Sequence, residues 1–165
     1  MQNTKSNEAT KEYAKVGVLA ALYVVLTIFV APFSYGAVQF RISEIFNHMI
    51  SFNKRYIWSL ILGCAIADVF SPLGMIDLAF GLPATIVTSF AIYFINKKVK
   101  SMKLRLVVST LVPTIGMAPV AVELMIVNNL PFWATYGTTA LGEFVSCAVG
   151  AVLIYALSRR IDLTK

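Results

Sequence analysis

The sequence predicts an all-α integral membrane protein with six transmembrane helices and both termini on the same side of the membrane. Of its 165 residues, 58% are apolar and only 13% are charged, and the mean hydropathy is +0.77. A soluble domain of this length could not cover so much apolar surface. The apolar runs have the length and composition of helices, whereas a transmembrane β-barrel alternates apolar and polar residues in segments of about ten. The third observation is that the basic residues fall on one side of these runs.

Six apolar segments follow one another along the chain. Pro32 stops the first, while Pro83 and Pro113 are expected to bend the fourth and the fifth. The second is short, because about 20 helical residues are needed to cross lipid. We expect a polar tail at 1–12, a membrane domain at 13–158 and a tail at 159–165, with membrane segments at 13–31, 42–52, 56–70, 76–95, 106–127 and 138–157, and loops at 32–40 and 128–137.

Lysine and arginine divide unequally between the two sides of these segments. When both termini are assigned to the cytoplasm, thirteen of the fourteen basic residues lie on that side: twelve in the tails or in the loops 53–55 and 96–105, and Lys15 in the first turn of the first segment. Only Arg41 is left outside. The positive-inside rule therefore predicts cytoplasmic termini and favours counting the short second segment as a crossing. The same pattern explains the net charge of +6 without nucleic-acid binding.

Five of the eight acidic residues fall in the outer half of this topology. They are Glu44, Asp68, Asp77, Glu123 and Glu143. Together with Arg41 they carry a charge of −4 if all are ionised. Carboxylates inside a membrane are costly and usually functional, so we expect an outward-facing, partly buried anionic pocket for a cationic or hydrogen-bond-donating ligand. A structural alternative stays open for three of them, since Asp77 could cap a helix, Asp68 could lie at the water interface and Glu44 could pair with Arg41 or His48.

The stretch 38–48 carries the densest run of polar residues between apolar segments. If 42–50 is α-helical, then Arg41, Glu44 and His48 share one face. His48 is expected to be structural, because no metal-ligand spacing accompanies it. Gln39 and Asn47 lie in the same stretch.

Aromatic residues of the outer loops could stack on a flat ligand or form an interfacial belt. They are Tyr35, Phe40, Trp133 and Tyr136. Cys64 and Cys147 lie inside apolar runs and are expected to be packed thiols. The sequence contains no nucleotide-binding loop, nucleophile elbow or zinc-protease motif. We therefore expect no metal, no cofactor and no enzymatic activity in this chain.

Small residues line one face of the first segment. Ala14, Gly17 and Ala21 recur at positions i, i+3 and i+7, and Thr10 would extend the stripe by one turn. Small residues let a second helix approach closely, which matters in lipid because association there relies on packing. This face is a candidate docking surface for a partner helix.

Three motifs resemble those of a known family. They are V-Q-F-R-I-S-E at 38–44, D-V-F-S-P-L-G-M-I-D at 68–77 continuing into F-G-L-P-A-T at 80–85, and the Gly-Glu pair at 142–143. On these motifs the chain resembles the QueT family of substrate-binding S components of energy-coupling factor (ECF) transporters, a family predicted to take up queuosine precursors. The Ala-x-x-x-Ala motif associated with S components is absent from the first segment, and its nearest match is Gly17-x-x-x-Ala21.

The resemblance implies a mechanism in the bacterial plasma membrane. An S component captures its ligand from outside, docks through its first helices on a transmembrane T component, and releases the ligand inside as two cytoplasmic ATPases drive the T component. The expected bundle is S-component-like. ATP hydrolysis would belong to the partners.

The resemblance also implies a ligand, a preQ1-like aminomethyl-deazaguanine. Carboxylates could accept the guanine-like N–H donors and pair the ammonium group. Glu143 and Glu123 are expected to bind these donors, with Asp77 and Asp68 next. Arg41 and Glu44 are expected to act as lid or gate residues. Donors for the ring oxygen, and the stacking residues, are sought among Gln39, Arg41, Asn47, Asn129, Trp133 and Tyr136.

Three other functions stay open at this stage. The protein could be an S component for another small cationic or heterocyclic nutrient. It could also be a structural or regulatory membrane protein whose acids form internal salt bridges, or a membrane enzyme of an unfamiliar type.

Overall fold

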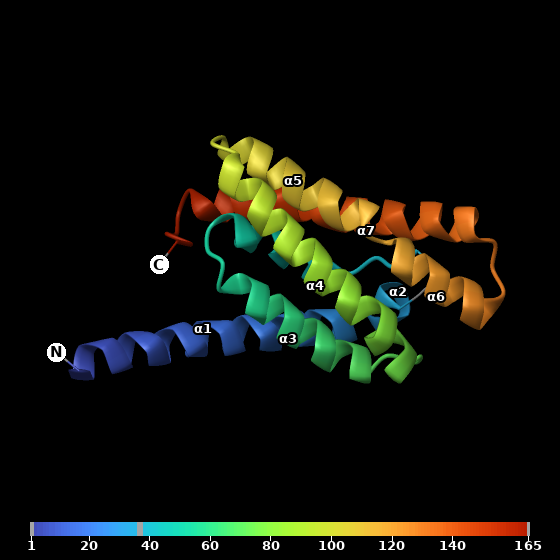
Figure 1. Ribbon diagram of the computed structural model, residues 1–165, viewed down its shortest axis with the longest axis horizontal. Coiled ribbons are helices and arrows are strands. Elements are labelled where there is room, and N and C mark those ends of the chain that lie inside the picture. The colour runs from blue at the N-terminus through green and yellow to red at the C-terminus, as the bar shows by residue number, and fades with distance from the viewer. Residues whose placement is uncertain (1, 36–37, 165) are drawn as a thin grey trace.

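The computed structural model describes residues 2–35 and 38–164, and every regular element within them is helical. The elements are α1 (Gln2–Phe29), α2 (Ala31–Ser34), a 3₁₀-helix η1 (Ile42–Ser51), α3 (Tyr56–Val69), α4 (Met75–Lys98), α5 (Met102–Ile115), α6 (Ala118–Asn128) and α7 (Phe132–Ser158). The long helices lie roughly side by side in one bundle, and α5 and α6 follow one another along it (Figure 1).

Four helical stretches of the described chain are long and apolar enough to cross a membrane. They are Thr10–Phe29, Met75–Lys98, Met102–Asn128 and Phe132–Ser158. The other two expected crossings are shorter. With ten residues at about 2 Å each, η1 spans about 20 Å, and α3 is of similar length, against a hydrocarbon core of about 30 Å. The number of crossings therefore stays a prediction.

Both termini lie at the same end of the bundle (Figure 1). The turns at 53–55 and 99–101 lie there as well, and we call this the basic end because it carries Lys54, Arg55 and Lys100. The turns at 71–74 and 129–131 lie at the opposite end. The first turns of α1 project beyond the other helices at the basic end (Figure 1).

Several element boundaries differ from those predicted. The segment 1–12 was expected to be a tail, yet α1 already begins at Gln2. The segment 128–137 was expected to be a loop, yet α7 begins at Phe132, where the fixed φ of the preceding Pro131 suits a helix start. The fifth segment breaks into α5 and α6 at Gly116 and Met117, close to two prolines that interrupt its hydrogen bonding.

The bundle buries its core between α1, η1 and α3. Tyr23, Ile57 and Leu60 are almost completely buried there. Close packing depends on two glycines: a Cβ atom at Gly63 would lie 2.8 Å from Cβ of Tyr23, and one at Gly150 would lie 2.7 Å from Cα of Ile45. These glycines let α3 approach α1 and let α7 approach η1. The outer faces carry exposed apolar side chains such as Val18, Val87 and Val152, as expected for helices in lipid.

Candidate substrate-binding site

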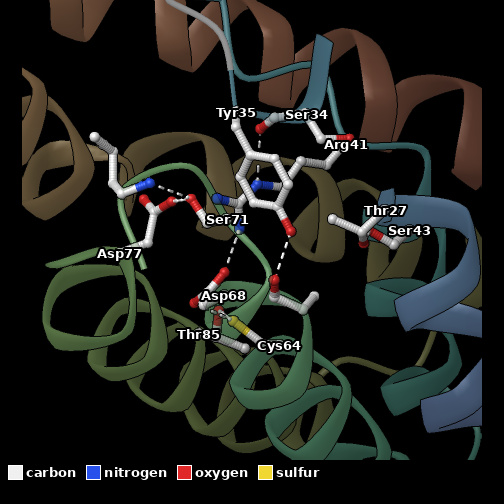
Figure 2. A network of polar contacts seen from close by, with 12 residues as sticks. Thr27, Ser34, Tyr35, Arg41, Ser43, Cys64, Asp68, Ser71, Asp77 and Thr85 are labelled. Atoms are coloured by element: carbon white, nitrogen blue, oxygen red, sulfur yellow. Dashed lines mark hydrogen bonds and ion pairs between the residues drawn. The ribbon is translucent and has the colours of Figure 1, made fainter. Parts of the chain in front are cut away.

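Arg41 is the buried cation around which the site is organised. Its Nε donates to the carbonyl of Ser34 at 3.1 Å, and its Nη1 lies 3.6 Å from Oδ1 of Asp68. Its guanidinium carbon lies 5.5 Å from the centre of the Tyr35 ring (Figure 2). Only Nη2 has no acceptor among the described residues, so Arg41 keeps one donor unused.

Tyr35 ties the segment before Arg41 to the end of α3. Its hydroxyl donates to the carbonyl of Ala67 at 2.7 Å (Figure 2). Partial burial raises the pKa of the Tyr35 phenol to about 12, which keeps the donating proton in place. Tyr35 was expected to stack on a ligand or to belong to an interfacial belt; its ring lies against the Arg41 guanidinium, and ligand stacking at Tyr35 stays a prediction.

The polar face of η1 differs from the predicted one. An α-helix would align Arg41, Glu44 and His48, but with three residues per turn a 3₁₀-helix aligns Arg41, Glu44 and Asn47. The Asn47 side chain donates to Oε2 of Glu44 at 2.7 Å. The hydroxyl of Tyr23 in α1 donates to Oε1 of the same carboxylate at 2.5 Å. Both oxygens of Glu44 are therefore already occupied by protein donors.

His48 lies away from this face. One ring nitrogen lies 3.1 Å from the Thr110 hydroxyl of α5, and the other lies 3.1 Å from the carbonyl of Ile45. One contact lies within η1 and the other joins η1 to α5, in keeping with the structural role expected for His48.

Asp68 is fully buried near the end of α3. The Cys64 thiol, one turn earlier, donates to Oδ2 at 3.3 Å. Helix α4 comes close at Gly81, where a Cβ atom would lie 2.9 Å from Oδ2 of Asp68. Asp68 was expected to lie either at the water interface or in the site. It is held in the interior between Arg41, Cys64 and the backbone of α4.

Asp77 and Glu123 meet at the start of α4. Asp77 lies in the first turn, but the cap residue is Gly74, with φ of +54°, so the capping role that stayed open for Asp77 is wrong. Asp77 instead accepts a hydrogen bond from the Ser71 hydroxyl (Figure 2). The Glu123 carboxyl group lies within hydrogen-bonding reach of Asp77 and is fully buried. Neither oxygen of Glu123 receives a hydrogen bond from the described residues.

Glu143 comes from the middle of α7 and is almost fully buried. Its Oε1 accepts a weak hydrogen bond from the Cys147 thiol at 3.4 Å. The preceding residue, Gly142, lies directly against the carbonyl of Val38, and any Cβ atom there would collide with it. At the Gly-Glu pair, the segment that precedes Arg41 therefore packs against α7, next to the carboxylate of Glu143.

A small cavity lies among these side chains. Its volume is about 30 Å³, enough for a few water molecules at most. Its polar lining comes from four elements or connecting segments: Arg41, Glu44, Thr85, Thr88 and Glu143. Gly81, Met117 and Val120 contribute apolar wall. The site is closed in this conformation, since pockets for small ligands usually exceed about 300 Å³.

The remaining predicted site residues lie outside this cavity lining. Gln39 is buried with φ of +53°, and its Oε1 has no donor among the described residues. Asn129 is exposed in the turn after α6, and Trp133 is 80% exposed. Tyr136 donates to the carbonyl of Ile115 at 3.1 Å. These placements separate Asn129 and Trp133 from the buried acids, and ligand contact at all four positions stays a prediction.

The small-residue stripe of α1 points outward. Ala14, Gly17 and Ala21 are all exposed, and a Cβ atom at Gly17 would meet nothing within 4 Å. The α1 helix does extend through Thr10, as the longer version of the stripe requires.

Sequence reasoning missed four polar residues of the site. Tyr23 orients Glu44, Ser71 donates to Asp77, and Thr85 and Thr88 line the cavity. A signal was available for the first, because Tyr23 and Thr27 stand four residues apart on one face of the apolar second half of α1. Ser71 and Thr85 lie within the motifs at 68–77 and 80–85, but hydroxyl side chains are common in membrane helices and do not by themselves mark a site.

An α-helical membrane protein that gathers acids and an arginine around an internal cavity fits the class of membrane transporters for small polar solutes. Comparison with known proteins agrees. Residues 13–159 match the model of the QueT transporter family, and the chain belongs to this family. It is 33% identical, over 167 residues, to the protein named Queuosine precursor transporter QueT from Lactococcus lactis subsp. cremoris strain MG1363, with 94% of this chain and 97% of the relative covered. No solved structure matches the chain.

Proposed function

We propose that this protein is the substrate-binding S component of an ECF-type importer and that it captures a queuosine precursor. The observation that carries this proposal is the donor-poor group of acids at and beside the cavity. Among the described residues, Glu123 receives no hydrogen bond, Glu143 receives only that of a thiol, and Nη2 of Arg41 finds no acceptor. Such groups are expensive to bury unless a ligand completes them.

A preQ1-like aminomethyl-deazaguanine has complementary chemistry. Its guanine-like edge offers adjacent N–H donors, which one carboxylate can accept side by side, and its ammonium group can pair with another. Glu143 and Glu123 are the main acceptors in this proposal, with Asp77 and Asp68 next. The unused Nη2 of Arg41 would donate to the ring oxygen. Gln39, Asn47, Asn129, Trp133 and Tyr136 remain secondary candidates.

The wider transport cycle is also part of the proposal. The chain would lie in the bacterial plasma membrane with six crossings and cytoplasmic termini, a topology supported by the basic end that contains both termini. The exposed stripe of Ala14, Gly17 and Ala21 would dock on a T component coupled to two ATPases. Transport energy would come from those partners.

The test is equilibrium binding to the purified protein in detergent. Isothermal titration with the aminomethyl-deazaguanine, its nitrile analogue, guanine and several vitamins should give the tightest binding for the aminomethyl compound. Tight binding of a different nutrient would retain the S-component role and change the substrate. No binding by a folded sample, together with no co-purification of a T component, would contradict the proposal and favour a structural role.

A further inference from the structure

The five buried acids differ in what the protein already supplies to each. Glu44 receives hydrogen bonds on both oxygens, from Tyr23 and Asn47. Asp68 is paired with Arg41 across 3.6 Å and its Oδ2 receives the Cys64 thiol, although its Oδ1 accepts no hydrogen bond from the described residues. These two carboxylates already interact with protein groups. They therefore hold neighbouring side chains in place rather than serve as the main acceptors for a ligand.

Asp77 and Glu123 are the reverse case. The Ser71 hydroxyl is the only side-chain donor that reaches Asp77 among the described hydrogen bonds, and Glu123 receives none. The two groups lie within hydrogen-bonding reach of each other, so they can share one proton, but no other donor reaches Glu123 among the described residues. Both are at least 99% buried, so bulk water does not supply further donors. Two carboxyl groups thus converge at a place to which the described residues bring a single hydroxyl donor, that of Ser71.

The pair lies next to the cavity. Gly81 follows Asp77 by four residues on α4, and Val120 precedes Glu123 by three residues on α6; both Gly81 and Val120 line the cavity wall. One helical turn, about 5.4 Å of rise, therefore separates the acid pair from the cavity along each helix. Glu143, in contrast, lines the cavity itself.

We propose that Asp77 and Glu123 together form an ammonium subsite beside the cavity, which selects ligands carrying a primary amine. This inference rests on the proposed function. An ammonium group is a compact charge with three donors, and two converging carboxylates offer it several acceptors. A planar N–H edge needs only one carboxylate and suits Glu143 on the cavity wall. The heterocycle would lie against Glu143, with its aminomethyl arm reaching toward α4 and α6.

The experiment compares two ligands that differ at the arm. The aminomethyl-deazaguanine carries the ammonium group, whereas its nitrile analogue is neutral. E123Q should weaken binding of the aminomethyl compound by about 10- to 100-fold and change binding of the nitrile by less than about threefold, because only the former loses a charge-assisted bond. E143Q should weaken both ligands to a similar degree, since both share the guanine-like edge.

Two further variants make the result decisive. D77N should reproduce the signature of E123Q with a smaller loss, and it serves if E123Q does not fold. E12Q makes the same chemical change in α1 beside Arg55, at the basic end, and should leave both affinities unchanged. Retained nitrile binding is itself the check that E123Q and D77N are folded, and thermal unfolding provides that check for E143Q.

The outcomes distinguish a failure of the ammonium subsite from a failure of the proposed function. If the wild type binds the aminomethyl compound but E123Q and D77N weaken both ligands equally, or neither, the ammonium subsite is wrong and the proposed function stands. If the folded wild type binds neither ligand, the ammonium subsite and the queuosine-precursor substrate are both wrong, and the vitamin panel and co-purification of a T component decide the S-component role. A collapse of the amine-to-nitrile preference in E123Q and D77N alone supports the subsite.

Discussion

Two polar clusters are buried in this bundle, and they are built differently. The inner cluster joins η1, α4 and α5: Ser51 and Ser109 lie 2.9 Å apart, and the Asn96 amide donates to Ser51 at 2.9 Å. His48 and Thr110 lie 3.1 Å apart nearby. Its members are hydroxyl, amide and imidazole groups that bond one another, and Oδ1 of Asn96 is the one buried oxygen of this cluster that receives no hydrogen bond from the described residues. The outer cluster holds five acids and one arginine.

The difference separates structure from function. Groups that satisfy one another lower the cost of burying them and hold helices in register. Buried acids without hydrogen-bond donors carry a desolvation cost that no internal contact offsets. The inner cluster is therefore expected to affect the stability of the fold alone. The outer cluster is expected to lower the stability of the fold and to bind the ligand.

The largest effect is expected from removing the cation of the outer cluster. R41A leaves Asp68 buried without its counterion and should lower the free energy of unfolding by about 3–5 kcal/mol, because an unpaired buried charge is costly. Thermal unfolding in detergent measures the loss. The double variant R41A/D68N should recover part of it, and a single variant as stable as the wild type would contradict the ion pair's role.

A change of opposite sign is expected at Glu123. Replacing its donor-free carboxylate with a neutral amide, E123Q, removes an unsatisfied group and lets the new amide donate to Asp77. The free energy of unfolding should rise by about 1–3 kcal/mol while affinity for the aminomethyl ligand falls. Unfolding and binding are measured on the same preparation, with E12Q as the control. A loss of stability would show that Glu123 serves the fold.

The inner cluster should respond in the opposite way. S109A removes the hydroxyl that contacts Ser51 and Asn96, so the free energy of unfolding should fall by about 0.5–1.5 kcal/mol. Ligand affinity should stay at the wild-type value, because the cavity lining is untouched. Weaker binding in a folded S109A protein would mean that the two clusters are coupled.

The smallest effect on the free energy of unfolding and on ligand affinity is expected outside the two clusters, on the small-residue stripe of α1. G17L places a large side chain where nothing lies within 4 Å, so stability should change by no more than about 1 kcal/mol and binding not at all. Co-purification with the T component should be lost, because a bulky residue keeps the partner helix away. Normal co-purification would rule out this face for docking.

The sequence predicted the helical membrane fold and a partly buried group of five acids, because long apolar runs with basic flanks mark membrane helices and acids within them are costly. The almost complete burial of Asp68 and Asp77 was not predicted. The sequence could not predict the 3₁₀ geometry of η1, which places Asn47 rather than His48 on the same face as Arg41. Helix type within a short polar stretch is decided by tertiary packing, here against Gly150 of α7.

The separation of the acids into occupied and unoccupied carboxylates was equally beyond the sequence. Glu44 and Glu123 look alike in a one-dimensional pattern, and only the positions of Tyr23 and Asn47 distinguish them. Trp133 shows that residues of one helix need not belong to one site. It lies on the same helix as Glu143, yet it is exposed near the start of α7.

The size of the cavity has a kinetic consequence. A space of about 30 Å³ cannot admit a bicyclic heterocycle until the packing around it opens. Ligand would therefore bind only the fraction of molecules that is open at any moment, so the association rate should lie well below the diffusion limit. In stopped-flow mixing, the observed rate should level off at high ligand concentration, at the rate at which the bundle opens.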